Sequence, residues 1–207
     1  MNIYIADASP LSSGDAFNKY YNLMPEFRRN KIDRCKLEKD KCLSLCAGIL
    51  LDRALSDLGK SHLLSTITVG TNGKPALEDD SIHFNLSHSG NIAMCVVADF
   101  SVGCDVQKTA KDNSSIARRF FTEDEIEYVF ADENSENVRD RFYRVWVMKE
   151  AYVKLSGEGI AKDFKSFSVF DTDVSFWEYE KDEYKYAVAS YFKIDADATP
   201  VIVRVGA

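Results

Sequence analysis

Apolar residues along the chain fall into two kinds of run, which differ in length and spacing. Short runs rich in β-branched and aromatic residues end at Gly, Pro, Asn or Ser, a pattern typical of strands. Longer runs repeat every three or four positions, which favours helices. The predicted strands are 2–8, 66–69, 82–86, 92–98, 102–107, 166–170, 174–179, 184–192 and 201–205. The predicted helices are 12–23, 25–58, 114–121, 122–130 and 135–155.

Local signals set several of the ends of these elements. Pro25 opens the long second helix and Gly59 stops it. Thr122 followed by Glu125 fits a capping box, in which the two side chains satisfy backbone N–H groups of the first turn. The polar residues 181–183 predict a hairpin turn between two strands.

The order of the elements occurs twice along the chain. Each half runs from a strand through short helices to a long helix and then several strands, although the halves share little sequence identity. We therefore predict an α+β protein of two similar α/β lobes, residues 1–100 and 101–207. No linker rich in Gly, Ser or Pro separates them, so we expect the lobes to pack tightly.

Composition narrows the class of protein. A hydrophobic content of 45% over 207 residues supports a packed core. The net charge of −7 argues against general nucleic-acid binding, and three histidines make a zinc site improbable. The five cysteines include no CxxC pair. The first residues lack the features of a signal peptide and no apolar run is long enough to span a bilayer, so we expect a cytoplasmic protein outside the membrane.

Candidate chemistry begins in the stretch Arg144 to Gly159, which predicts a helix that ends at a double glycine stop, Gly157 and Gly159. Trp146, Glu150 and Lys154 recur at spacing four and so lie on one face. The ordinary interpretation is a stabilising surface pair of Glu150 and Lys154, worth a few tenths of a kcal/mol. The alternative is that Glu150 is half of a metal site.

Three other stretches also carry polar groups. Asp105 and Gln107 lie two apart on the strand 102–107, so their side chains leave the same face. Residues 85–90 (NLSHSG) form a small polar loop that could bind phosphate, and residues 73–75 form a turn. Each stretch alone has a plain structural interpretation. Together they supply two carboxylates, a lysine and a Ser-His loop, which favours magnesium-assisted phosphoryl chemistry on a diphosphate.

At these residues the chain resembles the 4′-phosphopantetheinyl transferase superfamily, in particular its surfactin-synthetase-activating (Sfp-like) type. The family pattern has a GKP turn, an NxSHS loop, a VG(I)D(V/I)E strand, an RRFFTxxE-like stretch and a WxxKE(A/S)xxK helix. Here these read Gly73-Lys74-Pro75, Asn85-Leu86-Ser87-His88-Ser89, Val102-Gly103-Cys104-Asp105-Val106-Gln107, Arg118-Arg119-Phe120-Phe121-Thr122-x-x-Glu125 and Trp146-x-x-Lys149-Glu150-Ala151-x-x-Lys154. Single motifs are weak, but five in family order are specific.

The resemblance implies two lobes related by a pseudo-twofold, with coenzyme A between them. It implies transfer of 4′-phosphopantetheine from coenzyme A to a serine of an apo acyl or peptidyl carrier protein, with release of adenosine 3′,5′-bisphosphate. Asp105 and Glu150 would hold Mg²⁺, and Lys154 would neutralise the phosphate. Glu125 or Glu150 is the candidate base for the serine. Lys74, Ser87 and His88 would bind the nucleotide end.

Two departures from the family pattern affect the site. Gln107 stands where the family often has Glu; the resemblance makes it a third metal position, with a water or weak amide contact and a weaker affinity for magnesium. Gln107→Glu is then expected to be tolerated. Arg28, Lys31 and Ser44 match the family's nucleotide-binding residues only loosely, and a solvated charged face is the alternative.

Two functions therefore compete. The first is the transferase, and the second is a carrier-binding module of the same fold that has lost catalysis. The basic run from Arg28 to Lys41 and the pair Arg118-Arg119 could dock an acidic carrier, with ordinary solvation as the alternative. Two lobes in one chain predict a monomer. The sequence leaves open whether the carrier serves fatty acid, polyketide or non-ribosomal peptide synthesis.

Overall fold

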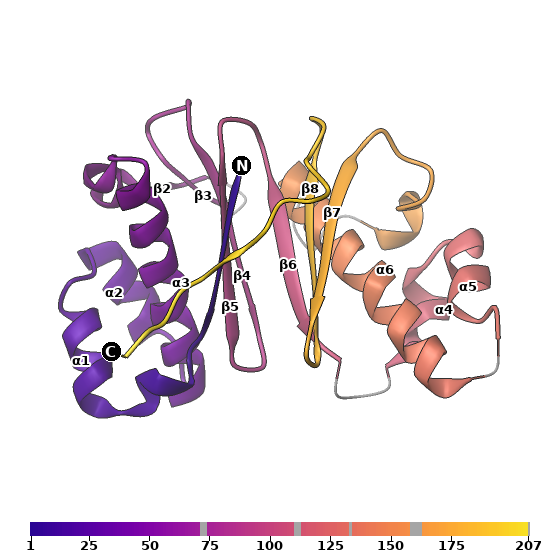
Figure 1. Ribbon diagram of the computed structural model, residues 1–207, viewed down its shortest axis with the longest axis horizontal. Coiled ribbons are helices and arrows are strands. Elements are labelled where there is room, and N and C mark those ends of the chain that lie inside the picture. Colours follow the sequence, from indigo (N-terminus) through magenta and orange to yellow (C-terminus); the bar gives the residue numbers. More distant parts are fainter. Residues whose placement is uncertain (71–73, 110–112, 133, 158–162, 207) are drawn as a thin grey trace. The chain divides into compact units, whose positions relative to one another are not determined.

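The computed structural model describes residues 1–70, 74–109, 113–132, 134–157 and 163–206 (Figure 1). Contacts between Cα atoms divide the chain into two units, Met1–Phe100 with Asp197–Ala207, and Ser101–Ala196. Helices and sheets occur in both units, which confirms the predicted α+β class. The pseudo-twofold relation between two lobes stays a prediction. Among the described residues, no helix combines the length and apolar character needed to cross a bilayer.

The first unit is built on a four-stranded sheet in the order β4-β5-β1-β9. Its strands are β1 (Asn2–Asp7), β4 (His83–Ser89), β5 (Ile92–Ala98) and β9 (Val201–Ile202). β5 pairs antiparallel with both β4 and β1, whereas β9 pairs parallel with β1. We predicted the strand 201–205 as part of the second lobe. In the structure, β9 belongs to the first sheet, where it pairs with the edge of β1.

Helices complete the first unit. They are α1 (Gly14–Tyr21), α2 (Glu26–Asp33) and α3 (Glu38–Asp57), with 3-10 turns η1 (Ser9–Ser12) and η2 (Ser61–Thr66) and the short strands β2 (Thr68–Val69) and β3 (Pro75–Ala76). α3 packs on β5 and β1 through an apolar stretch that is buried on most sides, as predicted for its second half. The prediction of one helix over 25–58 was wrong. The helix is interrupted between Asp33 and Glu38, and the charged α2 packs against α3.

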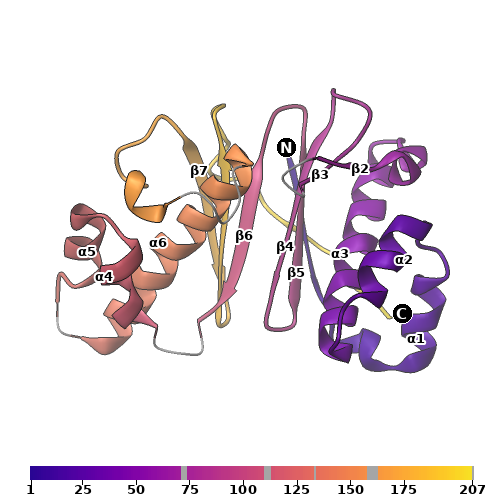
Figure 2. The ribbon, with the colours of Figure 1, turned by 180° about the vertical axis from the view of Figure 1, so that it is seen from behind.

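The second unit pairs a sheet with one long helix. The sheet has the antiparallel order β6-β8-β7, with β6 (Gly103–Lys108), β7 (Ser175–Lys181) and β8 (Tyr184–Ser190). α6 (Ser135–Ser156) runs along the sheet (Figure 2). It contacts β6 and β8. The other helices among the described residues of this unit are η3 (Ser114–Ile116), α4 (Ala117–Phe120), α5 (Glu123–Val129) and η5 (Phe164–Ser166).

Local signals explain the ends of α6 and of the β7–β8 hairpin. The side chain of Asn134 caps α6 by accepting from Glu136 N at 2.9 Å, and Gly157 ends it in the left-handed region at φ 73°. Gly159, the second glycine of the predicted stop, lies outside the described residues. The predicted hairpin turn at 181–183 is confirmed. The predicted strand 166–170 was wrong, because this segment begins with η5 and continues without strand pairing in the described part of the chain.

At Gly103 the backbone of β6 lies close against the backbone of α6. A Cβ added there would lie 2.1 Å from Ala151 O and 2.3 Å from Leu155 N. Both are backbone atoms of α6, so no side chain can move aside to make room. Gly103→Ala is therefore expected to lower the free energy of unfolding by about 3 kcal/mol, as overpacking of a tight interior does. Urea denaturation measures the loss.

A matched alanine at an open glycine separates this effect from backbone entropy. Gly14, at the first position of α1, has nothing within 4 Å of an added Cβ. Gly14→Ala should leave the unfolding midpoint nearly unchanged or raise it slightly. Equal midpoints for Gly103→Ala and the wild type would contradict the close approach.

Candidate functional site

The contact between β6 and α6 brings together the side chains predicted for the metal site. Lys154 Nζ lies 2.6 Å from Asp105 Oδ1. Gln107 Nε2 donates to Asp105 Oδ2 at 3.1 Å, which places both side chains on one face of β6 as predicted. The Asp105 side chain is only 3% exposed, whereas that of Lys154 is 29% exposed. One buried carboxylate therefore accepts from two neighbours, one of them charged.

Glu150 precedes Lys154 by one turn of α6 and is half-buried. Burial raises the pKa of Glu150 and the negative charge of Asp105 raises it further, while Lys154 opposes the shift. Burial alone would lower the pKa of Lys154, but the charge of Asp105 and its hydrogen bond, together with other neighbours that include Glu150, raise the pKa. The site thus contains two carboxylates close enough to repel, with a protonated lysine beside them.

The two carboxylates fit a hard divalent cation. Magnesium takes few protein carboxylates and completes its shell with water and substrate oxygens. Asp105 and Glu150 supply two such oxygens, and a cation between them would relieve the repulsion that raises the pKa of Glu150. Within the described ranges there is no group of three or more His, Cys, Asp or Glu side chains that could hold a metal ion. A cation here would draw on Asp105 and Glu150 as its carboxylate ligands.

Glu125 occupies a different environment from the one predicted for a base. Its carboxylate is fully buried and accepts from Thr122 N at 2.9 Å and from Val169 N at 2.8 Å. Lys149 Nζ lies 2.9 Å away and is also fully buried. The predicted capping box is confirmed. Three donors surround this carboxylate, which gives it a structural role; its assignment as a candidate base stays a prediction.

In the first unit, the structure brings Arg28 and Ser44 together. The guanidinium of Arg28 is 2% exposed and donates from Nη2 to Ser44 O at 2.6 Å. Among the described residues, Arg28 Nε and Ser44 Oγ have no hydrogen-bond partner. Burial lowers the pKa of Arg28, and desolvation followed by the charge of Arg28 lowers the pKa of Lys31. Two cations and two unsatisfied polar atoms make this a place where an anion would be stabilised.

Lys74, Ser87 and His88 also belong to the first unit. Lys74 is half-buried immediately before β3, while Gly73 of the predicted turn lies outside the described residues. Ser87 is buried and His88 is exposed, as expected for neighbours on a strand. The predicted loop 85–90 was wrong in form, since β4 continues to Ser89 and the turn follows at Gly90. The side chains remain at the end of the strand that leads into that turn.

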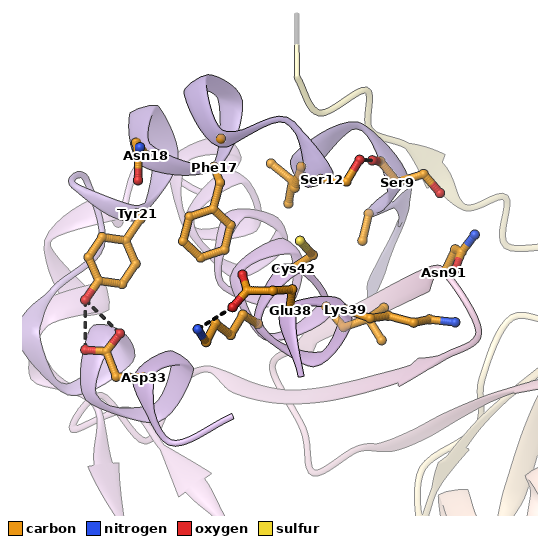
Figure 3. Close-up of a pocket in the computed structure, with 15 residues that line it drawn as sticks. Ser9, Ser12, Phe17, Asn18, Tyr21, Asp33, Glu38, Lys39, Cys42 and Asn91 are labelled. Atoms are coloured by element: carbon orange, nitrogen blue, oxygen red, sulfur yellow. Dashed lines mark hydrogen bonds and ion pairs between the residues drawn. The ribbon is translucent and has the colours of Figure 1, made fainter. Parts of the chain in front are cut away.

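A separate cavity of about 620 Å³ lies in the first unit (Figure 3). Its walls come from η1, α1, the end of α2 at Asp33, the start of α3 and Asn91, and they include none of the predicted site residues. Tyr21 Oη donates to both oxygens of Asp33 at 2.9 and 2.8 Å, and Lys41 pairs with Glu38 at 2.6 Å. Sequence patterns did not indicate this cavity. The signal in hindsight is α1, which has a polar composition and no fully buried residue.

The sequence is similar to a known family of proteins. A family model described as the 4′-phosphopantetheinyl transferase superfamily matches residues 101–197. The chain is similar to 4′-phosphopantetheinyl transferase Sfp of Bacillus subtilis (strain 168), with 32% identity over 164 residues that cover 77% of this chain and 71% of the relative. It is similar to 4′-phosphopantetheinyl transferase psf-1 of Bacillus pumilus, with 31% identity over 81% of this chain and 74% of the relative. A shorter match of 40% identity to 4′-phosphopantetheinyl transferase HetI of Nostoc sp. covers 44% of this chain and 40% of the relative.

Proposed function

The chain belongs to the 4′-phosphopantetheinyl transferase superfamily, and we propose that it transfers the 4′-phosphopantetheine arm of coenzyme A to a serine of an apo acyl or peptidyl carrier protein. The other product is adenosine 3′,5′-bisphosphate. The observation that carries the proposal is the cluster of Asp105, Glu150 and Lys154 where β6 meets α6. We further propose that the enzyme acts as a cytoplasmic monomer.

Each residue of the cluster has a task in this reaction. Asp105 and Glu150 would hold Mg²⁺, which when bound supplies a Lewis acid to the diphosphate. The ammonium of Lys154 stabilises negative charge that develops on the phosphate leaving group. Glu150 is also the residue we assign to accept the proton of the carrier serine. Glu125 is left out of this assignment because its carboxylate is fully buried by structural donors.

The first unit would bind the anionic end of coenzyme A. Arg28, Lys31 and Ser44 are the residues we assign to a phosphate, because they combine positive charge with polar atoms that have no partner in the described residues. Lys74, Ser87 and His88 are assigned to the nucleotide end on the strength of the family resemblance. In this assignment, the residues that bind the nucleotide end of coenzyme A and the residues that carry out the transfer lie on different helices and strands.

Loss of Arg28 is expected to weaken coenzyme A binding without weakening the fold. Arg28→Met should raise KM for coenzyme A by about 10- to 100-fold, the usual effect of removing a hydrogen bond to a charged group. Stability should hold or increase, because the guanidinium is buried with an unsatisfied Nε. Steady-state kinetics and urea denaturation measure the two effects. Arg29→Met, at the half-buried neighbouring position of α2, is the control, and equal KM values for both variants would refute the assignment.

A direct assay tests the activity itself. Purified protein with coenzyme A, Mg²⁺ and an apo carrier should give a carrier heavier by one phosphopantetheine in intact-mass spectrometry. The competing function is a carrier-binding module without catalysis. The observation that favours it is Gln107, which stands where the family often has a glutamate. Carrier binding with no mass change for any of several carriers would favour that module.

The carrier partner is expected to be acidic. Arg118 and Arg119 are both exposed, and their guanidinium groups lie over Phe130 and Phe120 at 5.0 and 5.2 Å from the ring centroids. Stacked arginines of this kind are held in place and remain available to carboxylates. Arg28, the first residue of the predicted basic run from Arg28 to Lys41, is buried and so is not available to dock a carrier. We propose the Arg118–Arg119 pair as the stronger docking candidate.

A further inference from the structure

Both oxygens of Asp105 are engaged by side chains of this chain. Lys154 Nζ contacts Oδ1 at 2.6 Å and Gln107 Nε2 contacts Oδ2 at 3.1 Å. The two donors come from different elements, since Lys154 is on α6 and Gln107 is on β6. The carboxylate is therefore neutralised from one side and oriented from the other.

A divalent cation that bound Asp105 would compete with Lys154 for the same atom. The Asp105 side chain is only 3% exposed, so there is little room for a second cation on Oδ1 while Lys154 stays at 2.6 Å. Like charges at such distances also repel strongly where the surroundings are poorly solvated. Lys154 has a place to go, because its own side chain is 29% exposed and can swing outward.

Gln107 has a role that a glutamate could not fill at this position. An amide Nε2 can donate to Asp105 Oδ2, whereas a carboxylate offers only acceptors. A glutamate would place a second negative charge beside Asp105 and Glu150, and would then depend on a bound cation to relieve the repulsion. The amide needs no such cation.

We propose that Lys154 and Gln107 together stand in for a divalent cation at Asp105, so that cation binding releases Lys154 from Asp105 while Gln107 continues to hold the carboxylate. The proposal rests on the proposed function in one respect, the assignment of Asp105 as a cation ligand. It adds that Lys154 becomes available for the substrate phosphate only after this exchange. Gln107 is accordingly a positioning residue, in place of the predicted third metal position.

The first test measures cation affinity without coenzyme A or carrier. Isothermal titration of Mg²⁺ into Lys154→Met is expected to show about tenfold tighter binding than into the wild type, because the competitor is gone. Lys154→Arg keeps the charge and should bind Mg²⁺ like the wild type. Lys108→Met removes a surface lysine of β6 whose partner Glu183 lies at 3.2 Å, and it controls for the general loss of positive charge. Equal affinities in Lys154→Met, Lys108→Met and the wild type would overturn the exchange.

The second test follows Lys154 directly. In protein labelled with ¹⁵N-lysine, the Nζ resonance that disappears in Lys154→Arg is assigned to Lys154. Saturation with Mg²⁺ should shift this resonance. Asp105→Asn should abolish both this shift and the binding of Mg²⁺ at this site. A resonance that does not move while Mg²⁺ binds at Asp105 would show that Lys154 is not displaced.

The third test concerns Gln107 and uses thermal unfolding in EDTA and in Mg²⁺. Gln107→Glu is expected to lower Tm in EDTA and to regain it in Mg²⁺, so that its metal-dependent rise in Tm exceeds that of the wild type. Gln107→Met removes the donor without adding charge, and should lower Tm in EDTA with no larger response to Mg²⁺. A Gln107→Glu protein with the wild-type Tm in EDTA would overturn the role of the amide. None of these readouts requires transfer, so an enzyme inactive on every carrier would refute the proposed function and leave this inference standing.

Discussion

Replacement of Glu150 by glutamine is expected to lower kcat/KM for carrier modification by about a thousandfold. Glutamine keeps the size of the side chain but cannot accept a proton, and loss of a general base typically costs about 10²- to 10⁴-fold. It also removes one of the two carboxylates proposed to hold Mg²⁺. Single-turnover transfer to an apo carrier, followed by intact mass, measures the loss, and titration of Mg²⁺ shows whether the cation requirement rises at the same time.

The same variant should fold as well as the wild type, which separates chemistry from stability. Burial and the charge of Asp105 raise the pKa of Glu150 in the folded protein. A carboxylate with a raised folded pKa binds protons more readily in the native state, so its ionised form destabilises the fold as pH rises through its pKa. Glu150→Gln removes this penalty. Its advantage in the free energy of unfolding over the wild type is therefore expected to be absent well below the ordinary pKa of glutamate and present at pH 7.

An exposed glutamate on the same helix provides the matched control. Glu136, in the first turn of α6, is exposed, and Glu136→Gln should leave kcat/KM unchanged. It should cost only a few tenths of a kcal/mol through the lost interaction with the helix dipole. Similar kcat/KM values for the two glutamine variants would show that Glu150 is neither base nor cation ligand.

The residues of the cluster could be identified from sequence because their spacing depends on local structure. Asp105 and Gln107 share a face whenever 103–108 is a strand, and Glu150 and Lys154 share a face whenever 135–156 is a helix. The contact between this strand and this helix does not follow from spacing, and its prediction depended on the family resemblance. Gly103 allows that contact, since its missing Cβ leaves room for the backbone of α6.

Errors arose where tertiary contacts decide the outcome. Residues 25–58 have a helical pattern throughout, but the break after Asp33 lets charged α2 pack on α3. Glu125 has the capping spacing that the sequence indicated, yet its burial depends on Lys149, which comes from another helix. The donor role of Gln107 depends on which side of its amide faces Asp105, and no residue pattern encodes that orientation.

The largest effect on stability is expected at Lys149, the neighbour of Glu150 that faces the interior. Lys149 and Glu125 are both fully buried with 2.9 Å between Nζ and Oε2. Lys149 Nζ also donates to Phe164 O at 2.6 Å and to Phe167 O at 2.7 Å. Lys149→Met should lower the free energy of unfolding by about 3–5 kcal/mol, the range measured when one partner of a buried ion pair is removed. Urea denaturation gives the value, with Lys41→Met as control.

The control removes a lysine from an ion pair at the surface. Lys41 pairs with Glu38 at 2.6 Å, but the Glu38 side chain is 81% exposed. Removing such a surface pair should cost at most about 1 kcal/mol. A Lys149→Met protein no less stable than Lys41→Met would contradict the buried network.

A double variant identifies the physical origin of the loss. Burial lowers the pKa of Lys149 while Glu125 opposes the shift. Removing two charges from water is costly, so a buried ion pair is weak evidence for net stabilisation by the attraction within it. The expected loss in Lys149→Met comes instead from the buried charge left on Glu125. Glu125→Gln removes that charge and keeps an acceptor for Thr122 N, because glutamine also serves in a capping box, but it gives up the acceptor for Val169 N. Glu125→Gln combined with Lys149→Met should therefore regain at most about half of the loss; a double variant less stable than Lys149→Met would show that the charge on Glu125 is not its source.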